Sequence, residues 1–182
     1  MYQLKEYVNY GELGVCQITA VGPQPELNPT QLYYTIKPLE HPENTIYLPA
    51  EKADQSSSIR RIVSAQTALH LLEEELPGLE IIEERNRKEK QTALEKAMKA
   101  HTCIEWCRIL KTLYSSRVQA SASARKKSTT EELLWKTAEE CLAGELSFTL
   151  GESKEDMKKR IWDRLKASCG DVSSSGERPA ML

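Results

Sequence analysis

The first fifty residues show the alternation and β-branching that are typical of short β-strands. Four segments are rich in β-branched or aromatic side chains, and glycines or polar turns separate them; they are residues 7–10, 15–21, 32–36 and 45–49. Residues 22–29 contain three prolines, which remove backbone donors, so we predict a loop there. Four short strands in so few residues predict a small SH3/Tudor-like β-barrel.

Beyond the serines at 56–58, apolar residues recur at helical spacing. The first run contains Ile59, Ile62, Val63, Leu69, Leu72 and Leu76 and ends at Pro77-Gly78, a pair that stops helices. Residues 80–99 predict a polar helix with a sparse apolar stripe. Two capping-box pairs open further helices, and these are Thr102 with Glu105 and Ser128 with Glu131. Ser153 with Asp156 resembles a further N-terminal cap.

The two patterns together predict an α+β fold of two domains. The first is the β-barrel of residues 1–57, and the second is an all-α domain of four to five helices over residues 58–169. Residues 170–182 are rich in serine and glycine and are expected to form a disordered tail.

Charge is distributed unevenly, although the formal net charge is only −2. Residues 1–57 hold three lysines against seven acidic residues, and residues 64–84 hold six glutamates without any lysine or arginine. Residues 85–127 reverse this balance, with twelve basic residues against three glutamates. Such a block favours a polyanionic partner, although most charge runs are simply solvated helix faces.

Several classes of protein do not fit the sequence. It contains no apolar run long enough to span a membrane and begins without a signal-peptide pattern, so we expect a cytoplasmic protein. The three histidines lie far apart, and no phosphate-binding glycine loop occurs. No serine or cysteine stands in a recognisable motif for a nucleophile with its general base. We therefore predict no catalytic residues and no enzyme activity.

The odd number of cysteines, five, favours free thiols in the core.

One local cluster could bind a metal. His101, Cys103 and Cys107 are close in sequence, and the two cysteines lie about one helical turn apart. Structural zinc takes four ligands, and no second pair of ligands completes the set, so we predict neither a metal nor another cofactor. Trp106 beside them could stack on a base, but a tryptophan at an apolar helix position more often packs in a core.

The order of several motifs carries a family resemblance. Gly14-Val15 is followed by residues 33–36, 46–53 and 59–62, and later by residues 94–96, 104–110 and 142–146. Over about residues 7–150 this order resembles the CarD-like family of bacterial transcription regulators. The N-terminal half of these proteins is similar to the RNA-polymerase-interacting domain of transcription-repair coupling factors.

The resemblance implies two binding surfaces. The N-terminal domain is expected to dock on the RNA polymerase β subunit by β-augmentation at strand 45–49. The residues expected at this contact are Tyr33, Ile46, Tyr47 and Leu48. The helical domain is expected to contact promoter DNA, largely without sequence specificity, and so to modulate open-complex stability. The residues expected there are Arg85, Arg87, Lys88, Arg108, Lys111, Arg125, Lys126 and Lys127.

Two departures from the family pattern bear on these surfaces. Tyr47 stands where some relatives carry a basic residue, and Asn86 stands where relatives carry a tryptophan that wedges into the opening duplex. One alternative function is a protein–protein adaptor in which the basic helix pairs with an acidic partner. That partner is another protein or the chain's own acidic segment, residues 73–84.

Overall fold

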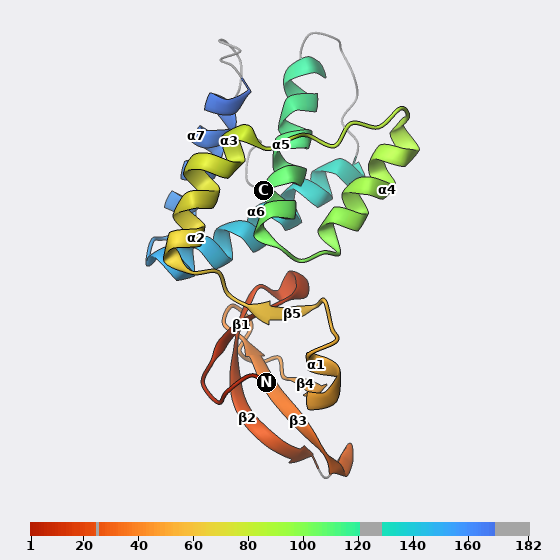
Figure 1. The fold of residues 1–182 in the computed structure, drawn as a ribbon, viewed down its shortest axis with the longest axis vertical. Coiled ribbons are helices and arrows are strands. Elements are labelled where there is room, and N and C mark those ends of the chain that lie inside the picture. Colours follow the sequence, from red (N-terminus) through yellow and green to blue (C-terminus); the bar gives the residue numbers. More distant parts are fainter. Residues whose placement is uncertain (25, 121–128, 170–182) are drawn as a thin grey trace.

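The computed structural model describes residues 1–24, 26–120 and 129–169 and shows an antiparallel sheet followed by packed helices (Figure 1). This confirms the predicted α+β fold. The strands are β1 (Tyr7–Tyr10), β2 (Val15–Gln24), β3 (Asn28–Pro38), β4 (Ile46–Pro49) and β5 (Ile59–Arg61). A 3₁₀ turn η1 (Gly11–Leu13) follows β1, and a short helix α1 (Ala50–Ala53) follows β4.

The strand order is β4-β3-β2-β1-β5, and all neighbours are antiparallel. In the described part of the chain β4 and β5 are the two edges and do not pair with each other, so the sheet is open where we predicted a closed barrel. Closure needs hydrogen bonds along a complete seam, and these edge strands have only four and three residues.

The proline-rich tract is mostly strand and not a loop. β2 runs on through Pro23 to Gln24, and β3 starts at Asn28, so the two strands form one long hairpin. β1 pairs with β2 only as far as Gln17, so at Pro23 the strand has a neighbour on one side alone. Strands with one free side tolerate proline, because a missing donor on that side is not needed for pairing.

Alternate residues of the strands build the core of the sheet domain. In register across β2, β3 and β4, Ile18 lies opposite Ile36, and Tyr34 opposite Leu48. These four side chains are buried together with Val8, Cys16, Ala53 and Ile59. Cys16 and Ile18, two residues apart on β2, lie on the face of the sheet that covers this core.

The strand β5 extends the sheet domain beyond the predicted boundary at residue 57. Ile59 pairs with Tyr10, and Arg61 pairs with Val8, so the segment read as the start of a helix is a strand. Its apolar spacing of three residues fits either element in so short a segment, and pairing with the distant β1 decides between them.

The helical domain starts at Ser64, whose side chain caps the first helix by accepting from Thr67 N. The segments α2 (Ala65–His70), η2 (Leu71–Glu75, a π-helical turn) and α3 (Leu76–Gly78) follow one another without a break. The remaining helices are α4 (Arg87–Met98), α5 (Cys103–Ala120), α6 (Thr129–Leu150) and α7 (Lys154–Ser168). One continuous apolar cluster joins them, with Trp106, Leu110, Leu142, Leu146 and Ile161 at its centre.

Helix caps agree in part with the sequence. The Thr102 hydroxyl accepts from Glu105 N (3.4 Å), and the Ser153 hydroxyl accepts from Asp156 N (3.1 Å), so both predicted caps are confirmed. α4 begins at residue 87, not 80, because Asn86 caps it by accepting from Glu89 N (2.9 Å). Ser128 and the predicted tail 170–182 lie outside the described residues.

Candidate functional site

The edge strand β4 is the first candidate for a binding surface. Among the described residues it pairs with β3 alone, so its second edge presents backbone donors and acceptors without a sheet partner. The opposite edge of the sheet, β5, lies next to the helices, whereas β4 lies away from them (Figure 1). β4 is therefore the edge that another chain can reach.

The four residues expected on this surface divide into two groups. Tyr47 is 45% exposed, and Ile46 is partly buried against the sheet core. Tyr33 and Leu48 are buried, and the Tyr33 hydroxyl donates to Gln31 Oε1 (3.0 Å). Leu48 belongs to the core of the sheet, whereas Tyr33 is buried outside that core, on the same face of the sheet as Tyr47. The assignment of these four residues to the polymerase contact stays a prediction. Leu32, 56% exposed on β3, is an apolar side chain that the sequence reading missed.

The N-terminal end of α4 is the second candidate. Arg85, Arg87 and Lys88 are all exposed there, and Asn86 between them is the helix cap. The first turn of a helix carries a partial positive charge from its free backbone N–H groups, which adds to these three cations. This end of α4, which we call its cationic end, thus gathers three cations at a helix N-terminus, with Glu83, Glu84 and Glu89 also exposed beside them.

Two other residues predicted to contact DNA, Lys111 and Arg108, bond to groups of the protein itself. Lys111 is buried, and its ammonium donates to the carbonyl oxygens of Leu76 (3.2 Å) and Pro77 (2.6 Å). It caps the C-terminal end of the α2–η2–α3 segment, where carbonyls lack helical partners, so it cannot reach DNA. Arg108 is half-buried and donates to Glu105 (2.7 Å) on its own helix. Arg125, Lys126 and Lys127 lie outside the described residues.

Arg117, another cation of the basic block, also has a structural role. Its guanidinium lies 4.2 Å from the centre of the Trp135 ring, and burial lowers its pKa from the ordinary value. On the acidic side, Glu73 pairs with Arg160 (3.0 Å) and Arg164 (3.6 Å) of α7. These contacts join Glu73 to α7 and not to the cationic end of α4.

The junction between sheet and helices contains a buried ion pair that the sequence reading missed. Glu145 on α6 is fully buried and accepts two bonds from the Arg60 guanidinium of β5, at 2.7 and 2.6 Å. It also accepts from Val63 N (2.9 Å) and Asn9 Nδ2 (3.1 Å). Burial alone would lower the pKa of Arg60, but the hydrogen bonds and charge of Glu145 raise it.

Comparison with family models matches residues 2–63 to the CarD-like/TRCF RID domain. For this similarity we call residues 2–63 the CarD-like domain. The match confirms the predicted resemblance for the N-terminal part of the chain. It ends two residues after β5, so it covers the whole sheet. Domains of this family bind the RNA polymerase β subunit. A search of curated proteins gave no match.

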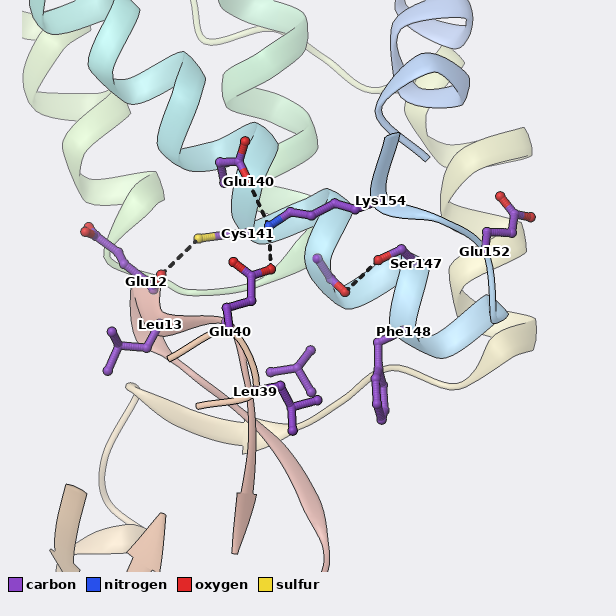
Figure 2. A pocket seen from close by; sticks show the side chains of 13 residues that line it. Glu12, Leu13, Leu39, Glu40, Glu140, Cys141, Ser147, Phe148, Glu152 and Lys154 are labelled. Atoms are coloured by element: carbon purple, nitrogen blue, oxygen red, sulfur yellow. Dashed lines mark hydrogen bonds and ion pairs between the residues drawn. The ribbon is translucent and has the colours of Figure 1, made fainter. Parts of the chain in front are cut away.

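A hollow of about 260 Å³ lies where the CarD-like domain meets α6 and α7 (Figure 2). Lys154 crosses it and pairs with Glu40 of the CarD-like domain (2.5 Å) and with Glu140 of α6 (2.8 Å). The Cys141 thiol donates to the carbonyl oxygen of Glu12 (3.7 Å). The charged side chains that line the hollow thus largely pair with one another. The hollow is therefore a contact region between the two domains more than a ligand site.

The cysteines next to His101 are core residues. Cys103 and Cys107 are buried in the helical core, and burial raises the pKa of both thiols above the ordinary value. In the described ranges no cluster of three or more His, Cys, Asp or Glu side chains is arranged to hold a metal ion. Within the same ranges no helix is long and apolar enough to cross a bilayer.

Proposed function

We propose that this chain is a non-enzymatic transcription regulator that binds the RNA polymerase β subunit through the free edge of β4. The observation that carries the proposal is an accessible, unpaired edge strand in a domain of the CarD-like/TRCF RID family. β-Augmentation gives affinity through main-chain bonds, and exposed side chains such as Tyr47 give specificity. Such a regulator works in the cytoplasm, where the polymerase acts.

The second half of the proposal concerns promoter DNA. Arg85, Arg87 and Lys88 at the start of α4 would neutralise backbone phosphates, with little reading of base sequence. Asn86 caps the helix and has no wedge-like side chain, so stabilisation of an open complex would come from phosphate contacts. Contacts that form in one promoter state alone would shift the equilibrium toward that state.

Substitution of Tyr47 tests the polymerase contact. We expect Tyr47→Glu in the full chain to weaken binding to the purified β subunit about tenfold or more, because a charge replaces an aromatic contact beside the docking edge. Fluorescence anisotropy with the labelled regulator measures the dissociation constant. The matched control is Leu133→Glu on α6, which adds the same charge at a position 65% exposed and far from β4. Wild-type affinity of Tyr47→Glu would contradict docking at this strand.

Salt dependence tests the DNA contact. We expect the triple variant R85Q/R87Q/K88Q to bind duplex DNA more weakly and to reduce the slope of log K against log salt by about 0.9 for each phosphate that is no longer neutralised. The control K136Q/K159Q/K166Q removes three exposed lysines of α6 and α7 and changes the net charge equally. Equally weakened binding in both triple variants would show that total charge, not the end of α4, governs binding.

The adaptor function remains the second candidate, in which the same cationic end of α4 pairs with an acidic protein. The contacts of Glu73 with α7 favour an external partner over the chain's own acidic segment. DNA binding that depends on the three α4 cations would favour the regulator over this alternative.

A further inference from the structure

The Arg60 side chain joins the CarD-like domain to the helical domain. Its Nε donates to the carbonyl oxygen of His101 (2.5 Å), in the turn between α4 and α5, while its two terminal nitrogens bond Glu145 on α6. The guanidinium also lies over the ring of Trp106 on α5, 5.4 Å from its centre. One side chain of β5 thus contacts three separate parts of the helical domain.

Glu145 completes the connection from the other side. Its carboxylate receives bonds from β1 through Asn9, from β5 through Arg60, and from the following segment through Val63 N. Asn9 and Glu145 are both inaccessible to solvent, and the Arg60 side chain is 21% exposed, so the ion pair is buried chiefly on its Glu145 side. Every one of these donors comes from the sheet side, and the acceptor comes from the helical side.

A buried ion pair of this kind sets geometry more than it adds stability. Removing the two charged groups from water is costly, and their attraction offsets that cost only when the bidentate geometry is satisfied. A shift of one domain over the other would leave a buried charge without its partner. Apolar contacts tolerate such a shift much better, because they are not directional.

Two other contacts across the junction, one ionic and one aromatic, are peripheral. Glu40 and Lys154 form an ion pair whose Glu40 side chain is 57% exposed, so solvent screens it. The rings of Tyr7 and Phe148 meet at a centroid distance of 4.8 Å, and both residues are more than a third exposed. These contacts can help to hold the domains together, but they restrict the angle between them less.

We propose that the Arg60–Glu145 pair fixes the orientation of the CarD-like domain relative to the helical domain, so that the free edge of β4 and the cationic end of α4 keep a constant spacing. The orientation itself does not depend on any partner. Its consequence for binding rests on the proposed function: a fixed spacing raises the effective concentration of one surface once the other is bound. Arg60 and Glu145 are thus positioning residues: they set the distance between the β4 edge and the cationic end of α4 without belonging to either surface.

Residual dipolar couplings of backbone amides in the full chain test the proposal without polymerase or DNA. The test variant is R60M/E145Q, which removes both charges, keeps the aliphatic bulk of Arg60 and leaves an amide oxygen for Val63 N. The matched control is Lys154→Met, which breaks the exposed ionic contact at the same junction. Amide chemical shifts inside each domain report that both remain folded.

The proposal predicts that couplings from both domains fit one alignment tensor in the wild type and in Lys154→Met. In R60M/E145Q the two domains require different tensors, while shifts within each domain are retained. Should the double variant fail to fold, Glu145→Gln alone is measured in the same way, since it removes the negative charge and keeps the side chain's shape. A single tensor in the charge-free variant, or two tensors in the wild type, would overturn the proposal.

Discussion

Glu145→Ala lowers the free energy of unfolding by about 3–4 kcal/mol, within the range expected when one partner of a buried ion pair is removed. The variant leaves the Arg60 guanidinium facing a void and leaves Val63 N and Asn9 Nδ2 without their acceptor. The lower part of the range applies because the Arg60 side chain is still 21% exposed, so water can solvate it partly. Urea unfolding followed by circular dichroism measures the decrease.

Two further variants test whether the unpaired charge causes this destabilisation. R60M/E145Q should recover much of the stability, because replacing both partners of a buried pair leaves no unpaired charge. Lys154→Met should lower the free energy of unfolding by about 0–1 kcal/mol, as expected for a pair near the surface. A Glu145→Ala variant as stable as the wild type would mean that water solvates the unpaired Arg60 guanidinium and that the junction is loosely packed.

Trp106→Ala should destabilise the protein by about 3–5 kcal/mol, the usual cost of emptying a large buried aromatic site. Trp106 is inaccessible to solvent at the centre of the helical core, and the Arg60 guanidinium lies against its ring. The indole is thus a core residue and is not available to stack on a base. Urea unfolding measures this change as well.

A milder substitution tests the same position without a large cavity. Trp106→Phe should keep the wild-type affinity for DNA, because the ring does not reach the surface. It also removes the buried indole N–H, for which the described residues provide no hydrogen-bond partner. Wild-type stability combined with weaker DNA binding in this variant would instead place Trp106 at the nucleic-acid surface.

Local pattern predicted most of the fold, and long-range pairing accounts for what it missed. The alternation in residues 7–10 and 45–49 and the caps at Thr102 and Ser153 correspond to observed elements. β5 was missed because three residues carry too little pattern, and its strand conformation depends on β1. Prolines in β2 misled the loop prediction because a strand with one neighbour at that point tolerates them.

The candidate site was less predictable because a sequence does not reveal burial. Lys111 and Arg85 belong to the same basic block, yet Lys111 caps a buried helix end while Arg85 is exposed. Glu145 did leave a trace: it is an acidic residue within the apolar run Leu142–Leu146, which is unusual on a core-facing helix. Its partner Arg60 could not be inferred, since the two lie 85 residues apart.

Hydrogen exchange of the full chain with and without the purified RNA polymerase β subunit tests the central claim most directly. If β4 accepts a strand of the polymerase, its outer amides become hydrogen-bonded, and peptides covering Ile46–Pro49 exchange more slowly in the complex. Peptides from α6 should exchange at unchanged rates. Binding that protects other segments and leaves β4 unchanged would show that the polymerase docks elsewhere, and absence of binding would contradict the proposed function itself.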